Sequence, residues 1–248
     1  MAVAVITGVS RRIGIGAAVA RRLAEAGWDL FLHSWSPHDA EQPWGADPEG
    51  AAAIVADLRT RVRVEHLVAD LADPDAPAQL VAAAEGAYGR VDALVANHAR
   101  SSTATLEELT AAELDLSYAV NTRATLLLVK EFAARCPGPG RVVLMTSGQH
   151  RGPMPGELPY IASKGALHQV TASLAAHLAP RGITVNAVDP GATDTGYADA
   201  AAHAAVLALE PMGRWGEPDD AARLIAWLAS DAGRWVTGQV LVSNGGGP

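Results

Sequence analysis

The sequence lacks residues and segments that several classes of protein require. It contains one cysteine, Cys136, so no disulfide can form within the chain, and we expect no metal site. A chain so poor in cysteine is typical of the reducing cytoplasm, which we expect as its location. No apolar run approaches the roughly 18 residues of a membrane-spanning helix, so we expect no membrane contact. The net charge of −8 argues against nucleic-acid binding.

What the sequence does contain is a regular alternation of short apolar segments and longer helical patterns. The strand segments are apolar without polar alternation, which is typical of parallel strands covered on both faces. Strands are expected at Val3–Ile6, Leu30–His33, Val64–Ala69, Ala93–Ala96, Val142–Thr146, Thr184–Val188 and Val240–Ser243, and helices near 16–26, 49–60, 76–86, 111–135, 160–178 and 219–230. The sequence therefore predicts an α/β fold: one doubly wound domain over residues 1–248, with a seven-stranded parallel sheet and helices on both faces.

Two local patterns refine this prediction. Thr110 with Glu113 three residues later indicates a capping box that opens the long helix 111–135. Residues 34–50 contain three prolines and two glycines, which favours a surface loop.

The stretch VAVITGVSRRIGIGAAVARRLAEAG, residues 3–27, places glycines between the first strand and the first helix. Such a turn directs backbone N–H groups at the positive end of the helix, which suits a pyrophosphate. Glycine is needed there because a Cβ would collide with the phosphates or with the neighbouring strand. The turn alone is a weak signal, since it also occurs without a ligand.

The strongest chemical pattern involves Tyr160 and Lys164, which lie four residues apart on one helix face. A nearby ammonium favours the phenolate and lowers the pKa of a tyrosine from its usual value of about 10. Ser147 follows a strand directly, where open α/β sheets bind their ligands. Asn121 lies within a long helix, where asparagine is slightly unfavourable and needs a reason.

In order and spacing, Asn121, Ser147, Tyr160 and Lys164 resemble the catalytic tetrad of the short-chain dehydrogenase/reductase family, in its single-domain branch of about 250 residues. The resemblance covers nearly the whole chain and implies a Rossmann-type fold and a small-molecule carbonyl or alcohol substrate. It implies that Tyr160 exchanges a proton with the substrate oxygen, which Ser147 polarises. Lys164 would lower the pKa of Tyr160 and hold the nicotinamide ribose, and Asn121 would position a water molecule. The overall pattern is similar to that of 3-oxoacyl-carrier-protein reductases, among other reductases.

The glycine loop departs from the family pattern Thr-Gly-x3-Gly-x-Gly. Five residues separate Gly8 from Gly14-Ile15-Gly16, so that two residues are added before Gly14 if Gly14 and Gly16 match the second and third glycines. The alternative alignment has no insertion and places Arg12 and Gly14 at those positions. We prefer the insertion because it preserves the register of the helix.

The cofactor is expected to be NADP(H) rather than NAD(H). NAD-binding folds place an acidic residue near the ribose 2′-hydroxyl, and NADP-binding folds place an arginine nearby. Here Ser34 occupies the acidic position, Asp39 lies in the loop beyond it, and Arg11 and Arg12 lie inside the glycine loop. Trp35 could flank the adenine or pack under the 34–50 loop. With the resemblance included, the expected cofactor-binding residues are Gly8, Ser10, Arg11, Arg12, Gly14, Ile15, Ser34, Asp70, Leu71, Asn97, Tyr160, Lys164, Pro190, Gly191 and Thr195.

Other segments carry further expectations. The turn Ala96-Asn97-His98-Ala99 replaces the family's Asn-Asn-Ala-Gly. Only Asn97 of that pattern is retained. We expect residues 195–210 to form a lid over the substrate. Candidate substrate-lining residues are His98, His150, Arg151 and Glu157. The resemblance also implies a homotetramer or dimer. A catalytically silent NAD(P)-binding regulatory or scaffold protein is the alternative function.

Overall fold

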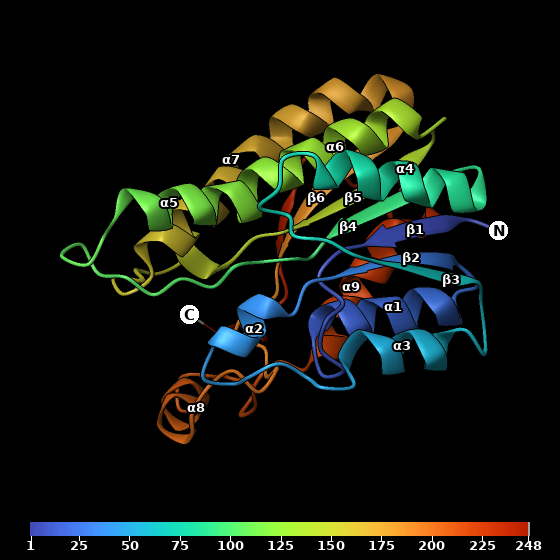
Figure 1. Cartoon of the computed structure of the whole chain (residues 1–248). Coiled ribbons are helices and arrows are strands. Elements are labelled where there is room, and N and C mark those ends of the chain that lie inside the picture. Colours follow the sequence, from blue (N-terminus) through green and yellow to red (C-terminus); the bar gives the residue numbers. More distant parts are fainter. Residues whose placement is uncertain (248) are drawn as a thin grey trace.

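The computed structural model describes residues 1–247, which form a parallel β-sheet with helices on both faces (Figure 1). The sheet has seven strands in the order β3-β2-β1-β4-β5-β6-β7, and all neighbouring strands are parallel. The strands are β1 (Val3–Ile6), β2 (Asp29–Ser34), β3 (Val64–Val68), β4 (Ala93–Ala96), β5 (Gly140–Met145), β6 (Ile183–Asp189) and β7 (Val240–Val242). The predicted doubly wound α/β fold is confirmed.

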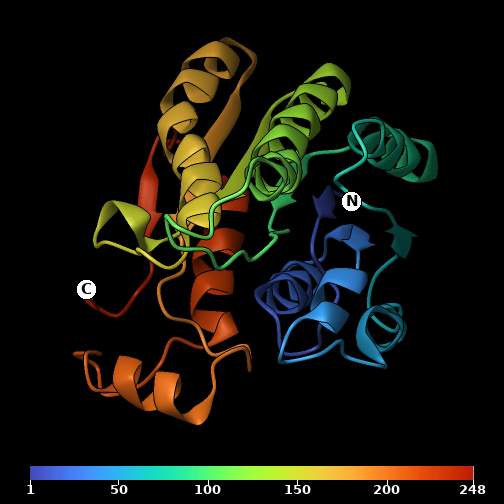
Figure 2. The same cartoon turned by 60° about the vertical axis from the view of Figure 1, so that its left-hand side comes forward.

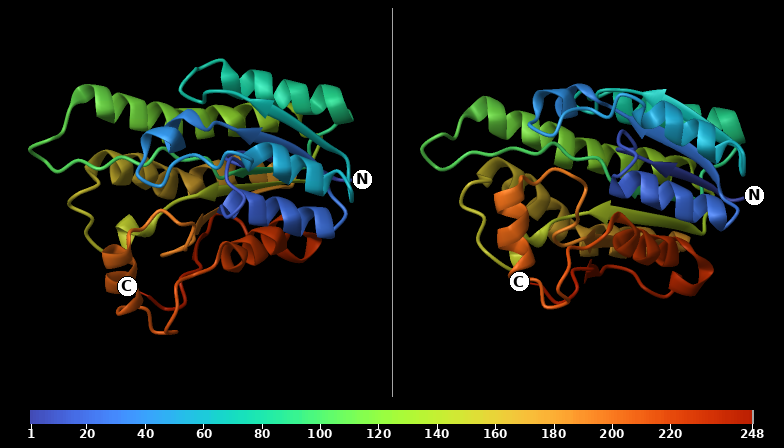
Figure 3. Two further views of the ribbon diagram at one scale, coloured as in Figure 1. Left: turned by 60° about the horizontal axis from the view of Figure 1, so that its bottom comes forward. Right: turned by 90° about the horizontal axis from the view of Figure 1, so that it is seen from below.

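The helices form two layers and a separate group at one end. Their bounds are α1 (Ile15–Glu25), α2 (Pro37–Glu41), α3 (Gly50–Leu58), α4 (Ala76–Tyr88), α5 (Ala111–Ser117), α6 (Ala124–Arg135), α7 (Leu158–Leu178), α8 (Ala200–Leu207) and α9 (Pro218–Ala229). Helices α1, α3 and α9 cover one face of the sheet, and α4, α6 and α7 cover the other (Figures 1 and 2). Helices α2 and α8 lie at the end of the molecule opposite the N-terminus (Figures 1 and 3).

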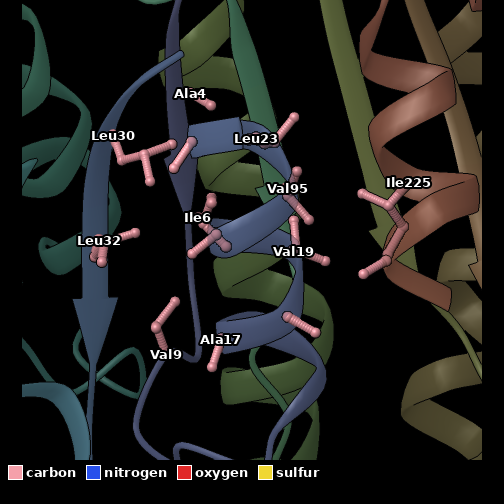
Figure 4. Packing of buried hydrophobic residues seen from close by; sticks show 14 of the residues in the cluster. Ala4, Ile6, Val9, Ala17, Val19, Leu23, Leu30, Leu32, Val95 and Ile225 are labelled. Carbon is pink, nitrogen blue, oxygen red and sulfur yellow. The ribbon is translucent and has the colours of Figure 1, made fainter. Parts of the chain in front are cut away.

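The core on the α1 face shows why the strands are continuous apolar runs. Ile6 of β1, Leu32 of β2 and Val19 of α1 are fully buried in one cluster, which Ile225 of α9 joins (Figure 4). Burying an aliphatic side chain of this size contributes about 1.5–3 kcal/mol. A second cluster, centred on Leu128 and neighbouring residues, fills the other face. A strand packed on both sides therefore has no position for a polar alternation.

The order of the strands reverses between β1 and β4, because β1 leads to β2 on one side and β4 lies on the other. Open α/β sheets bind ligands at such a point, outside the carboxyl ends of the strands. The loops that follow β1, β2, β3 and β4 meet there.

Three segments differ from the prediction or add to it. The 34–50 loop contains the short helix α2, which has no buried residue and therefore no apolar periodicity that the sequence could reveal. The predicted helix 111–135 is interrupted by a π-helical turn, Tyr118–Arg123. Residues 195–210 contain α8, whose N-cap Asp199 accepts a hydrogen bond from the N–H of Ala202 at 2.8 Å.

The predicted capping box at α5 is half formed. The Thr110 hydroxyl accepts from the N–H of Glu113 at 3.2 Å. The Glu113 carboxylate does not complete the box, because it binds the guanidinium of Arg100 with two contacts of 3.0 Å.

Within residues 1–247, none of the helices is both long enough and apolar enough to span a bilayer.

Candidate active site

The loop after β1 is joined to the loop after β4 through Asn97. Its side-chain amide donates to the carbonyl oxygens of Thr7 at 3.1 Å and Gly8 at 3.0 Å, and its N–H donates to the Thr7 hydroxyl at 3.1 Å. Gly8 has φ of +72°, and a Cβ on it would lie 2.7 Å from the Cα of His98. Only glycine fits both the conformation and the space at this position.

Gly14 and Gly16 begin the first helix. Gly14 is the extended N-cap residue of α1, and no side chain caps this helix. A Cβ on Gly16 would lie 2.6 Å from the carbonyl oxygen of Gly8. Close packing of helix against strand is the role of the last glycine in a dinucleotide-binding turn. The packing therefore supports the alignment with two added residues and argues against the one that matches Arg12 and Gly14.

A cavity of about 430 Å³ lies at the carboxyl ends of β1 to β4. Its volume falls in the range of about 300–1,000 Å³ that is usual for ligand sites. Of the residues expected to bind the cofactor, those that line it are Gly8, Ser10, Arg11, Gly14, Ile15, Asp70, Leu71, Asn97 and Thr195. These residues come from segments far apart in the sequence, so the fold brings together most of the residues expected to bind the cofactor.

Arg12 and Ser34 do not line this cavity, contrary to expectation. Arg12 is exposed and forms ion pairs with Glu49 and, at 2.9 Å, with Asp47, both in the 34–50 segment. The Ser34 hydroxyl lies 2.8 Å from the Nε2 of His66. Successive residues of a strand point to opposite faces, so His33 rather than Ser34 is directed at the cavity.

Pro190 and Gly191 lie just beyond β6 and also outside the cavity lining. Gly191 has φ of +63°, and a Cβ on it would lie 2.4 Å from the Cβ of Asn244. The turn therefore packs against the segment after β7, and this contact explains the glycine.

His33 and His98 are buried beside the glycine loop as neutral rings. The Nδ1 of His33 accepts from the N–H of Gly8 at 3.3 Å, and its Nε2 lies 2.9 Å from the carbonyl oxygen of Ala69. The Nε2 of His98 lies 3.0 Å from the carbonyl oxygen of Val120. A carbonyl can only accept, so Nε2 carries the hydrogen in both rings. Burial lowers the pKa of His33 to about 4 and that of His98 to about 3.

Arg11 lines the cavity, but its guanidinium is engaged with the segment after β6. Its Nη2 donates to the carbonyl oxygen of Thr195 at 2.7 Å. Thr195 lines the same cavity. The side chain thus joins the glycine loop to the start of the 195–210 segment.

Asn121 is fully buried in the π-helical turn. Its Oδ1 accepts from the N–H of Arg100 at 2.7 Å, and its Nδ2 donates to the carbonyl oxygen of Arg100 at 3.0 Å and to the Ser163 hydroxyl at 2.9 Å. π-helical turns occur frequently at functional sites. Its three side-chain hydrogen bonds are directed at the loop after β4 and at α7, and they explain why an asparagine occurs inside this helix.

Ser147, Tyr160 and Lys164 lie together at the carboxyl end of β5. Ser147 follows this strand, and its side chain is close enough to that of Tyr160 to lower the pKa of the phenol against the effect of burial. The Nζ of Lys164 lies 6.0 Å from the centre of the Tyr160 ring and donates to the carbonyl oxygen of Met145 at 2.8 Å. The Thr146 hydroxyl donates to the carbonyl oxygen of Lys164 at 3.2 Å, which ties the strand to α7.

The pKa of Tyr160 is shifted in the opposite direction to the expectation that Lys164 lowers it. Burial raises the pKa of Tyr160 to about 12; the hydrogen bond with Ser147 opposes this, and the charges of Glu157 and Asp189 add to it. Burial also lowers the pKa of Lys164 to about 8. Burial disfavours the charged form of each group. In this structure burial is therefore the largest influence on the pKa of both groups.

The candidate substrate-lining residues occupy different surroundings. Glu157 is the half-buried N-cap residue of α7, and burial raises its pKa. Arg151 holds the segment after Ser147 to the end of β6, because its Nε lies 2.9 Å from the Asp189 carboxylate. His150 is exposed. His98 lies in the wall of the cavity near β1.

Helix α2 forms an outer wall of the cavity, which the sequence did not reveal. The Nδ1 of His38 lies 3.1 Å from Nη1 of Arg100, and the N–H of Ser101 donates to its Nε2 at 3.2 Å. His33 and Arg100 could have been found as polar residues at the ends of buried strands, but His38 gives no such signal. Trp35 lines the cavity, in agreement with a place beside a bound base.

The donors and shape of the cavity fit a dinucleotide. A Cβ would fill the cradle at Gly8 and Gly16, and the uncapped start of α1 leaves its first N–H groups available to a pyrophosphate. Asp70 lines the cavity, and only one of its two carboxylate oxygens has a hydrogen bond in the described residues, from the N–H of Ala72 at 2.8 Å.

Comparison with known proteins gives long and consistent matches. A family model described as Enoyl-(Acyl carrier protein) reductase matches residues 8–247. The uncharacterized oxidoreductase YjdA of Bacillus subtilis is 42% identical over 98% of this chain and 96% of that protein. The chloroplastic NADPH-dependent aldehyde reductase-like protein of Arabidopsis thaliana is 33% identical over 98% of this chain and 93% of that protein.

Solved structures agree with these relatives. A blue fluorescent protein from a metagenomic library, in complex with NADPH, has a TM-score of 0.89 and 35% identity, with 99% of this chain and 97% of that chain covered. A short chain dehydrogenase of Burkholderia cenocepacia J2315, in complex with NADP, has a TM-score of 0.87 and 36% identity, with 98% and 96% covered.

Proposed function

The chain belongs to the short-chain dehydrogenase/reductase family of oxidoreductases, and we propose that it interconverts a carbonyl group and a secondary alcohol with NADP(H) as the hydride carrier. The observation that carries this proposal is the group at the end of β5. The side chain of Ser147 acts on that of Tyr160, and Lys164, one helical turn further along α7, lies close enough to His98 in the cavity wall for its charge to lower the pKa of that ring. Two neighbouring hydroxyl groups can bind the same substrate oxygen.

Each residue then has a distinct task. Tyr160 gives its proton to the carbonyl oxygen in reduction and takes it back in oxidation, while Ser147 donates a hydrogen bond to the same oxygen. Lys164 lies on the same helix face. It holds the nicotinamide ribose, and its charge favours loss of the proton from Tyr160. Asn121 fixes the backbone of Arg100 and the Ser163 hydroxyl, and so positions water for the proton path. When bound, the nicotinamide supplies or accepts the hydride at the carbonyl carbon.

The preference for NADP(H) over NAD(H) has two supports. Both solved neighbours described above hold NADP(H). Among residues 1–247, no carboxylate occupies the end of β2, where Ser34 faces His66. Asp39 lines the cavity further on, but its Oδ1 accepts a hydrogen bond from the Trp44 indole at 3.0 Å.

The substrate is a small carbonyl compound or alcohol, covered by a lid at residues 195–210. We also infer a homotetramer, or a dimer, formed through the outer faces of α5–α6 and α7. Light scattering of the purified protein measures its mass directly, and a mass of one chain, 25.6 kDa, would contradict this assembly.

A titration and one substitution test the proposed activity. Tryptophan fluorescence should report NADPH binding at least tenfold tighter than NADH, about 1.4 kcal/mol. Tyr160→Phe should lower kcat for a neutral aldehyde or ketone about a hundredfold or more, the usual contribution of a proton donor.

The outcomes separate the rival functions. Undiminished turnover in Tyr160→Phe would remove the mechanism. NADPH binding without turnover of any carbonyl or alcohol in a broad panel would favour the catalytically silent protein. Preference for NADH would favour Asp39 as the residue that binds the ribose hydroxyl groups.

A further inference from the structure

The enlarged glycine loop touches the start of the lid segment at two places. Nη2 of Arg11 donates to the carbonyl oxygen of Thr195 at 2.7 Å. At the next residue, a Cβ on Gly196 would lie 3.0 Å from Cδ1 of Ile13 and 3.6 Å from Nη2 of Arg11. Gly196 has φ of +73°, so both the backbone conformation and the space favour glycine there. The backbone of Thr195 and Gly196 therefore lies directly against the enlarged part of the glycine loop.

The start of the lid segment also contacts the 34–50 segment. The ring of Tyr197 meets the ring of Trp44 edge-on, with centroids 6.3 Å apart, and the ring of Trp215 at 6.0 Å. The Trp44 indole in turn donates to Asp39, which lines the cavity. Residues 195–197 thus bridge from the glycine loop to the segment that carries α2.

The rest of the lid segment has few attachments among the described residues. Helix α8 has no buried residue. Its clearest anchor is His203, whose ring stacks on that of Trp215 at 4.7 Å and whose carbonyl oxygen accepts from the Trp215 indole at 3.0 Å. A segment with so little buried surface opens easily, so the contacts at 195–197 have a large share in holding it.

We propose that Arg11 and Ile13 form a latch that holds residues 195–197 across the mouth of the cofactor cavity, and that Arg11 serves this latch rather than the selection of the 2′-phosphate. Thr195 follows β6, on the far side of the reversal point from β2, whose end faces the ribose 2′ group in dinucleotide folds. The latch therefore acts equally on NADPH and NADH. Its effect on cofactor affinity rests on the proposed function, whereas its effect on the lid segment does not.

Hydrogen exchange of the protein without nucleotide tests the latch itself. Arg11→Met and Ile13→Ala should each speed the exchange of amides in residues 196–209 at least threefold. Ile13 is 56% exposed, so Ile13→Ala should fold normally. Arg11→Lys should restore part of the protection because it keeps a donor. The control is Arg234→Met, which removes an exposed guanidinium that bonds the carbonyl oxygen of Asp231. It should leave exchange in the lid segment unchanged.

Fluorescence titration then tests selectivity. Arg11→Met should raise the Kd of NADPH and of NADH at least fivefold each, with their ratio unchanged within a factor of two, and should speed the dissociation of both. Unchanged exchange in Arg11→Met and Ile13→Ala would overturn the latch. A tenfold loss of NADPH affinity with NADH unaffected would assign Arg11 to the 2′-phosphate. If the wild-type protein bound neither nucleotide, the proposed function would fall, while the exchange result would still decide the latch.

Discussion

Replacing Lys164 with methionine should make the protein more stable at neutral pH while removing its proposed activity. Only 2% of Lys164 is exposed, and its three N–H donors have one acceptor among the described residues, the carbonyl oxygen of Met145. Burial lowers its pKa from the ordinary 10.5 to about 8. At roughly 1.4 kcal/mol per pH unit, this difference corresponds to about 3 kcal/mol of destabilisation by the charged form. Methionine keeps a similar volume and carries no charge.

The pH dependence distinguishes this cause from a general change in packing. Below about pH 8 the lysine is charged in both folded and unfolded chains, so the destabilisation is fully present. Between 8 and 10.5 the unfolded chain binds more protons than the folded one, so the stability of the wild-type protein rises with pH relative to the variant. The advantage of Lys164→Met should therefore be largest at pH 7 and should shrink towards pH 10.

Urea denaturation without nucleotide, at pH 7 and pH 10, measures this difference. The chain offers a matched control, because Lys130 is its only other lysine and its side chain is 72% exposed. Lys130→Met should change the free energy of unfolding by less than about 0.5 kcal/mol at either pH. A variant Lys164→Met that is less stable than wild type at pH 7, or an advantage that does not shrink at pH 10, would refute the reasoning.

Three further predictions concern stability. Gly16→Ala should destabilise the protein by about 1–3 kcal/mol because its Cβ would lie 2.6 Å from a carbonyl oxygen. Gly86→Ala, in open space within α4, should stabilise the protein by about 0.5–1 kcal/mol. Equal effects of the two substitutions on thermal unfolding would contradict this. His33 and His98 take up protons on unfolding, so stability should fall as pH drops from 6.5 towards 4, by about 1.4 kcal/mol per pH unit for each ring; a flat profile in urea unfolding would exclude neutral native rings. Thr110→Ala should cost about 0.5–2 kcal/mol through loss of the N-cap of α5, and no change in Tm would show that the cap is redundant.

The strands were predictable because burial on both faces leaves a direct trace in the sequence. Val3–Ile6 and Ala93–Ala96 are buried throughout, and each appears as an uninterrupted apolar run. Helix α2 leaves no such trace, since none of its residues is buried and its position depends on contacts of His38 with the loop after β4. The π-helical turn also escapes prediction, and the partners that hold the Asn121 side chain within it, Arg100 and Ser163, are distant in sequence.

The candidate site divides in the same way. Residues whose backbone matters, such as Gly8 and Gly16, could be nominated from their spacing, because only glycine fits a crowded turn. The directions of the Arg12 and Ser34 side chains could not be predicted, because they follow from partners in other segments. Arg12 pairs with the Asp47 carboxylate, and Ser34 bonds to the His66 ring. The roles of Tyr160 and its neighbours remain predictions that the substitutions above test.

The π-helical turn at Tyr118–Arg123 has a consequence for the permitted length of the chain. An α-helix turns by about 100° per residue, and a π-helical turn holds one residue more than the α-helical pattern. Helices α5 and α6 are therefore out of phase with each other. Deleting a single residue between them would let one continuous α-helix form, but it would rotate the amide of Asn121 away from the backbone of Arg100. In this part of the protein, the number of residues is as strictly constrained as their identity.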